Sequence, residues 1–400
     1  MTEDVRHERL RFRVSTQEME RRWKAIKDAM KANNIDSFFA QNNNKWLGGY
    51  VRYLIDIPGE NSYPKTVFFP VDDGMALIVS GGEPLPPSPP DWAIRGISQK
   101  FARPYFRTLN FTNDYDAKVA VDLVKRRNDK RVGFVGLGLM DAFFVQYLKD
   151  NLPQVEFVDV TDMIDEIKAI KSEEEISYIR KAIALQDAIF AAAPTFIRPG
   201  KYEWQLRTEM IRMCFDLGGE EQLIMIGSNS PGNSTGQFHQ FYQNRQIKAG
   251  DQVLIMLEVN GPAGFYGEIA RTFSLGEPPK DLVEAFEVAK QAQHLGASLI
   301  KPGVLPKTVL DAINDFNVSK GYLADKRLVG HGQGYDLVER PGFNPDETMT
   351  FKENMCIAIH PIALSPDFKT YAFCCDNYLL TDKGAELMHK TPQEVIVIDI

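Results

Sequence analysis

Histidine and cysteine are scarce in this chain of 400 residues, and a long apolar run is missing altogether. The four cysteines have neither the spacing of a disulfide framework nor that of a zinc ribbon. No apolar run reaches the roughly 18 residues that a membrane span needs, and the first residues carry no apolar leader. We therefore expect a reduced, cytoplasmic protein without a membrane partner.

The chain also lacks an excess of basic residues. Lys and Arg together number 46 against 54 Asp and Glu, which gives a formal net charge of −8. A nucleic-acid-binding protein usually carries a basic face, so nucleic acid is not an expected partner. A hydrophobic share of 44% and a charged share of 25% are ordinary for a globular enzyme, and the length allows two domains.

The pattern of apolar residues divides the chain into two parts. Strand-like and helical runs alternate over residues 1–165, which predicts a small α/β domain. Ser172 and Glu175 then form a capping box that predicts the start of a long helix. Residues 166–400 are predicted to combine long helices with strands, which indicates an α+β domain; its main strands are expected at residues 222–226, 252–259, 269–273, 355–361 and 372–380.

Three of the six histidines lie in contexts that predict one active site. His331 stands between two glycines, whose lack of a Cβ lets the imidazole approach backbone and ligand closely. His360 ends an apolar strand, and His239 precedes a turn at residues 248–251. Imidazoles serve as general acids and bases near neutral pH, and they also bind metal ions. The residue types alone leave both roles open.

The order of several motifs resembles the creatinase/aminopeptidase P/methionine aminopeptidase family. The resemblance covers nearly the whole chain and is carried by residues 167–176, His239 followed by Gly250-Asp251, residues 263–266 (Ala-Gly-Phe-Tyr), residues 270–273 (Ala-Arg-Thr-Phe), residues 330–334 (Gly-His-Gly-Gln-Gly) and residues 380–384. It implies a pita-bread catalytic domain over residues 166–400, preceded by a smaller creatinase-like α/β domain over residues 1–165. It also implies a homodimer.

The departures from the family pattern concern its metal ligands. The resemblance implies two aspartates, a histidine and two glutamates, whereas this chain has Glu258 and Glu268 near the aspartate positions. His331 matches the family histidine, and His360 and Cys375 replace the glutamates. A pair of metal ions needs bridging carboxylates to offset its repulsion. We therefore expect no metal and no other cofactor, as in creatinase, the metal-independent branch.

That resemblance implies roles for individual residues. His239 would be the general acid and base, and His331 would orient the substrate or stabilise charge. From the chemistry of the side chains alone, His331 or His360 could stabilise negative charge if protonated, and Glu258 or Glu268 could orient an imidazole. Arg340 is a candidate clamp for a substrate carboxylate or, alternatively, part of a surface ion pair. Three further side chains are candidate substrate contacts: Arg52, Phe265 and Tyr266.

The leading hypothesis is a creatinase-like, metal-independent hydrolase. It would cleave an amide, amidine or ureido C–N bond in a small, polar, carboxylated metabolite. The alternative is a metal-dependent Xaa-Pro peptidase-like hydrolase or a lyase, with a rearranged site of Glu268, His331, His360 and Asp376. A second alternative is a non-catalytic binding protein. The metal content of the purified protein distinguishes the first two.

Overall fold

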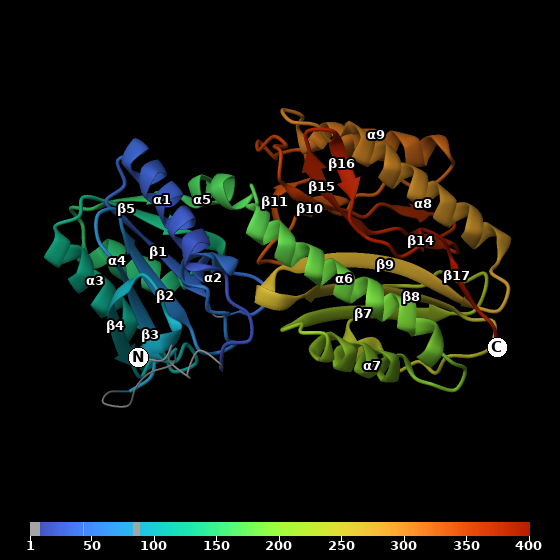
Figure 1. Ribbon diagram of the computed structural model, residues 1–400, viewed down its shortest axis with the longest axis horizontal. Helices are drawn as coiled ribbons and strands as arrows, with labels where there is room; N and C mark the ends of the chain where they lie inside the picture. The colour runs from blue at the N-terminus through green and yellow to red at the C-terminus, as the bar shows by residue number, and fades with distance from the viewer. Residues whose placement is uncertain (1–8, 43, 83–88) are drawn as a thin grey trace. The chain divides into compact units, whose positions relative to one another are not determined.

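The computed structural model describes residues 9–42, 44–82 and 89–400, which form two compact units that meet in the sequence at Lys168 and Ala169 (Figure 1). Both units mix helices and strands, in agreement with the expected α+β class. Within the described ranges, no helix combines the length and the apolar character that a membrane span requires.

The first unit is built on a sheet whose strand order is β4-β3-β2-β1-β5-β6. The strands are β1 (Ser37–Asn42), β2 (Lys65–Pro70), β3 (Met75–Ser80), β4 (Ile97–Arg103), β5 (Arg131–Val135) and β6 (Glu156–Asp159). β1 pairs antiparallel with β2 and parallel with β5. The helices are α1 (Thr16–Ala32), α2 (Gly49–Ile55), α3 (Tyr115–Arg127), α4 (Ala142–Asn151) and α5 (Thr161–Lys168).

The second unit contains the two longest helices and all the strands that carry the candidate site. Its helices are α6 (Glu173–Phe196), α7 (Glu203–Asp216), α8 (Lys280–Leu299) and α9 (Pro306–Ser319). The predicted capping box begins α6: the Ser172 hydroxyl accepts a hydrogen bond from the Glu175 backbone N–H, and the Glu175 carboxylate accepts one from the Ser172 N–H.

Two larger sheets form the body of this second unit. One has the order β17-β9-β8-β7 and the other the order β11-β10-β12-β15-β16. Their strands are β7 (Gln222–Asn229), β8 (Gln252–Asn260), β9 (Tyr266–Leu275), β10 (Gly330–Gly332), β11 (Glu339–Gly342), β12 (Cys356–Ile359), β15 (Asp376–Thr381), β16 (Gly384–Leu387) and β17 (Ile396–Ile398). A small pair, β13 (Ile362–Leu364) and β14 (Tyr371–Phe373), lies beside them.

Strands β8 and β9 are buried along their whole length because both faces of their sheet are covered. Alternate side chains such as Leu257 and Ile269 pack against α6, as Figure 1 shows for the helix along this sheet. The opposite face carries Met256 and Ala270, which pack against Phe373. Side chains alternate along a strand, so Glu258 and Glu268 must point to this second face.

Candidate active site

Glu268 belongs to β9 and stands directly opposite Glu258 of β8 in the antiparallel register. Directly opposed side chains lie about 5 Å apart at Cβ. Both carboxyls are buried, and Glu268 is fully so. Two acidic side chains are thus forced together on the inner face of the sheet, toward the strands that carry the histidines.

His331 is the central residue of β10, and its flanking glycines are required by the packing of that strand. A Cβ on Gly332 would lie 2.3 Å from the Arg340 backbone oxygen, and one on Gly330 would lie 2.9 Å from the Ala358 oxygen. The His331 Nδ1 donates to the Gly332 carbonyl at 2.9 Å. The other ring nitrogen, Nε2, is turned toward Glu268.

His360 directly follows β12, which pairs with β10 so that Gly330 lies opposite Ile359. Its backbone N–H donates to the Val329 carbonyl at 2.9 Å, which fixes the residue beside β10. The His360 and His331 rings lie 5.1 Å apart between their centroids. Two strands separated by more than twenty residues of sequence therefore bring the two imidazoles together.

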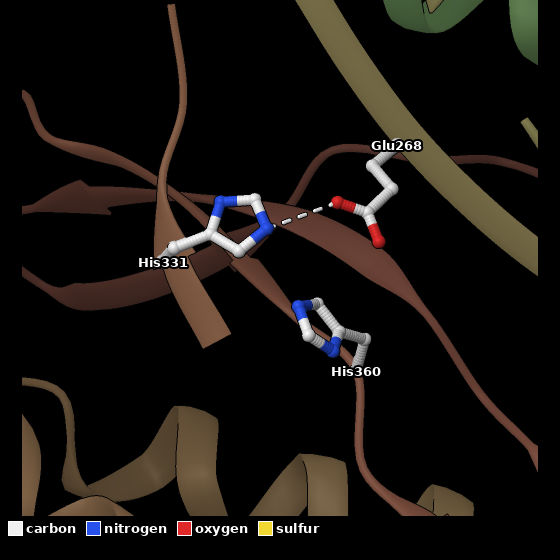
Figure 2. A group of neighbouring side chains, drawn as sticks. All are labelled: Glu268, His331 and His360. Carbon is white, nitrogen blue, oxygen red and sulfur yellow. Dashed lines mark ion pairs between the residues drawn. The ribbon is translucent and has the colours of Figure 1, made fainter. Parts of the chain in front are cut away.

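Glu268, His331 and His360 form one buried cluster (Figure 2). One potential ligand atom from each residue lies within 4.8 Å of the other two. The His331 Nε2 is 3.2 Å from the Glu268 Oε2, the ion pair drawn as a dashed line in Figure 2. Two imidazoles and one carboxylate in this arrangement can hold a positive charge, whether a proton or a metal ion.

The surroundings of the cluster shift the pKa values of its two imidazoles in opposite directions. Burial lowers the pKa of His360 to about 4, and the charges of His331 and Arg327 act in the same direction. For His331 burial is outweighed by its contact with the Glu268 carboxylate, and the pKa lies above its ordinary value. Burial also opposes ionisation of Glu268, but His360, His331 and Cys375 outweigh it and hold the pKa of that carboxyl below its usual range.

Glu258 and Cys375 complete the surroundings of Glu268. Burial, with the charge of Glu268, raises the pKa of Glu258 well above its ordinary value, so Glu258 favours its protonated form. Burial likewise raises the pKa of Cys375 well above normal. As a thiol, Cys375 donates from Sγ to the Glu268 Oε1 at 3.2 Å, which leaves Oε2 facing the histidines.

Several residues expected at the site lie elsewhere. His239 is exposed, immediately before a short 3-10 helix, and does not belong to the cluster. The Arg340 Nη2 pairs with the Glu347 carboxylate at 2.5 Å, which corresponds to the ion-pair alternative. Arg52 is a buried residue of α2 in the first unit.

Two further expected substrate contacts, Phe265 and Tyr266, are buried in the second unit. The Phe265 ring stacks on Tyr335 with 4.2 Å between centroids. The Tyr266 backbone N–H donates to the Gly334 carbonyl at 2.7 Å. Both residues thus contact the loop that follows His331, and a role for them in substrate binding stays a prediction.

Asp376, the fourth ligand of the alternative site, is engaged by an arginine instead. Its Oδ1 lies 2.7 Å from the Arg271 Nη2, and neither side chain is exposed to solvent. Its Oδ2 accepts hydrogen bonds from Gln293 and Gln393. Arg271 and Asp376 therefore form a buried structural ion pair.

Sequence reasoning missed two groups beside the cluster. The His389 ring lies between the Asp187 carboxylate, at 3.3 Å from Nδ1, and the Glu268 backbone oxygen, at 3.0 Å from Nε2. Nothing in the sequence links positions so far apart. Arg327, whose Nη2 donates to the His360 carbonyl at 3.2 Å, stands four residues before His331, and that proximity was the available signal.

Comparison with known proteins identifies the class of this fold and site. Residues 177–382 match the model of metallopeptidase family M24. The probable dipeptidase PepE of Mycobacterium tuberculosis strain H37Rv is 27% identical over 285 residues, which cover 68% of this chain and 75% of the relative. The Xaa-Pro dipeptidase of Pyrococcus furiosus is 26% identical over 262 residues, covering 65% and 74%.

A solved structure extends the likeness to the whole fold. Dipeptidase PepE from Mycobacterium ulcerans superposes with a TM-score of 0.78 at 22% identity, over 97% of this chain and 100% of that one. The chain belongs to metallopeptidase family M24. The predicted pita-bread fold with a preceding smaller domain is thereby confirmed.

The expectation of a metal-independent, creatinase-like hydrolase is wrong. The matching family is one of metallopeptidases, and the similar proteins are named dipeptidases and Xaa-Pro dipeptidases. The residue at the centre of that mechanism, His239, lies at the surface, whereas a potential metal-ligand set lies buried in the core. An imidazole is itself a good metal ligand, so His360 at one of the replaced glutamate positions does not exclude a metal ion.

Proposed function

We propose that this protein is a metal-assisted hydrolase of peptide C–N bonds in short substrates, with Glu268, His331 and His360 as ligands of one divalent transition-metal ion. The observation that carries the proposal is the convergence of these three buried donors within 4.8 Å of one another. The dipeptide size of the substrate is inferred from the names of the similar proteins.

The donor set fits such an ion on chemical grounds. The His360 Nδ1 is buried and has no hydrogen-bond partner within the described part of the chain, and the buried Glu268 Oε2 makes only the 3.2 Å ion pair with the His331 Nε2. Buried polar atoms without partners are costly. The His331 Nδ1 donates to a backbone carbonyl, which is the usual way in which a ligating histidine is oriented. Two nitrogens and one oxygen favour Zn²⁺ or a neighbouring transition metal over Mg²⁺ or Ca²⁺, which prefer oxygen.

The protein groups around this site have defined tasks in amide hydrolysis. Bound there, such an ion would polarise the substrate carbonyl and lower the pKa of a water molecule. Glu258 would hold a proton on its carboxyl and pass it to the leaving nitrogen, since its pKa is raised by burial and by Glu268. The Cys375 thiol would keep the Glu268 carboxylate in its orientation through Oε1.

The test measures metal and activity on the same samples. The intact protein is loaded with Zn²⁺, Co²⁺ or Mn²⁺, dialysed, and assayed by elemental mass spectrometry and by chromatography of a dipeptide panel with and without proline. We expect about one equivalent of metal, and chelation should abolish hydrolysis. His331→Ala and His360→Ala should each lose the metal, whereas the matched surface variant His239→Ala should retain it.

Turnover that persists at less than about a tenth of an equivalent of metal would refute the proposal. Metal retention by His331→Ala and His360→Ala would refute the ligand set alone. A homodimer and a cytoplasmic location are further parts of the proposal, supported by the resemblance and the composition.

A further inference from the structure

Arg327 presents a guanidinium group beside the buried cluster in a fixed orientation. Its Nε and Nη2 donate to the two carboxylate oxygens of Asp325 at 3.1 and 2.8 Å. Its Nη2 also donates to the His360 backbone oxygen at 3.2 Å. One edge of the planar group is therefore occupied, and the position of the group is tied to the residue that we propose as a metal ligand.

The face of the guanidinium is also fixed. The Arg327 Cζ lies 5.2 Å from the centroid of the Phe373 ring, a cation–π contact. The same Phe373 ring lies 6.0 Å from the His360 ring. The Phe373 ring therefore lies near both the Arg327 guanidinium and the His360 ring, which places the charged group close to the proposed metal site.

The remaining nitrogen of Arg327 is available to a ligand. Nη1 makes no hydrogen bond to any described residue, and 38% of the side chain is exposed, in contrast to 3% for His331. A guanidinium that is held by one edge and stacked on a ring loses little further entropy when its other edge binds a carboxylate.

Tyr371 offers a second donor next to it. Its ring lies 6.4 Å from that of Phe373 on β14. Burial raises the pKa of Tyr371 to about 12; Arg327 opposes this and Asp325 adds to it. The hydroxyl therefore keeps its proton at neutral pH, and Tyr371 and Arg327 lie near each other because both contact the Phe373 ring.

We propose that Arg327, assisted by Tyr371, binds the free carboxylate of the substrate. The enzyme would then select acyl-amino acids or dipeptides in which a single residue with a free carboxylate follows the scissile bond. This assignment rests on the proposed peptide hydrolysis. Arg340, which the sequence suggested for the same task, already faces Glu347 through Nε and Nη2. Arg327 instead keeps one nitrogen open beside His360.

The test compares a dipeptide with the same dipeptide as its C-terminal amide, using the metal-loaded full chain. Wild type should prefer the free carboxylate. Arg327→Ala should lower kcat/KM for that substrate by about 10- to 100-fold, chiefly through KM, as expected for a hydrogen bond to a charged group. Hydrolysis of the amide should change little. Arg327→Lys should restore part of the preference, and Tyr371→Phe should reduce it by a smaller factor.

Lys326→Ala is the matched control, because it removes a positive charge from the neighbouring exposed residue. It should leave the ratio of the two kcat/KM values unchanged. Equal losses on both substrates in Arg327→Ala and Arg327→Lys would assign Arg327 a structural role through Asp325 and overturn the proposal. Loss of the preference in Arg340→Ala alone would also overturn it.

Binding measured by calorimetry separates this inference from the proposed function. If neither substrate is hydrolysed but the free dipeptide binds more tightly than its amide, and Arg327→Ala removes the difference, the clamp stands and the proposed reaction fails. If hydrolysis occurs with no difference between carboxylate and amide in wild type, the reaction stands and the clamp fails.

Discussion

The buried ion pair between Arg271 and Asp376 should be critical for stability, and the change Asp376→Asn tests this. Neither side chain is exposed. Arg271 donates in addition to four backbone oxygens, those of Ala270, Cys375, Thr391 and Pro392. The substitution keeps the shape of the side chain but leaves the buried guanidinium without its counter-charge.

The expected magnitude follows from the environment of the charge. Removal of one partner from a buried pair costs about 3–5 kcal/mol. Because the four carbonyls still solvate Arg271, the lower end of about 3 kcal/mol applies. At about 2–4 °C per kcal/mol for a domain of this size, Tm should fall by about 6–12 °C. Scanning calorimetry of wild type and variant measures this directly.

Asp382→Asn is a suitable control, because Asp382 is an exposed carboxylate near the same strand and its loss should shift Tm by less than about 2 °C. The variant Asp376→Asn should still bind metal at temperatures where it is folded. A Tm within about 2 °C of wild type, combined with loss of the metal, would refute this reasoning and make Asp376 a ligand.

Three further outcomes are expected. Gly332→Ala should destabilise the protein by about 1–3 kcal/mol and weaken metal binding, because the new Cβ would meet the Arg340 oxygen at 2.3 Å; Gly138→Ala, which has open space, is the control in calorimetry. Glu258→Gln should lower kcat by about 10²–10⁴-fold while Tm stays within about 2 °C, and a parallel loss of stability would contradict a proton-transfer role. Burial raises the pKa of Asp116 to about 6, so the folded state holds that proton more tightly than the unfolded state and stability falls as pH rises from about 4 to about 6. Asp116→Asn should remove this part of the pH dependence of Tm, and an unchanged profile would contradict it.

The parts of the site that the sequence predicted depend on local patterns. The alternation of side chains along β8 and β9 fixes which face of the sheet carries Glu258 and Glu268. The glycines on either side of His331 indicate a close approach between strands. The capping box located the start of α6 to within one residue. Each of these signals is contained in a few neighbouring residues, so no knowledge of the tertiary structure is needed to recognise it.

Elements that depend on distant contacts were not predicted. The aromatic and β-branched side chains of residues 46–53 favour a strand, yet residues from Gly49 onward form α2. The reason is tertiary packing: Trp23 of α1 donates from Nε1 to the Leu54 carbonyl at 2.8 Å, which holds the helix despite its β-prone side chains. The expected strand over residues 372–380 is likewise two strands in different sheets, because Cys374 and Cys375 connect β14 to β15.

The charge of the site links its metal ligands to the proposed carboxylate clamp. Of the two facing carboxyls only Glu268 is expected to be ionised, because burial keeps a proton on Glu258. One carboxylate against a divalent ion leaves a positive charge uncompensated in a buried site, which is costly. A substrate carboxylate at Arg327 would offset part of that cost. We therefore expect the preference for a free dipeptide over its amide to weaken in the metal-free protein even though Arg327 is unchanged, and calorimetric titration of both forms measures it. An equal preference for the free dipeptide with and without metal would mean that the charge of the ion does not affect carboxylate binding at Arg327.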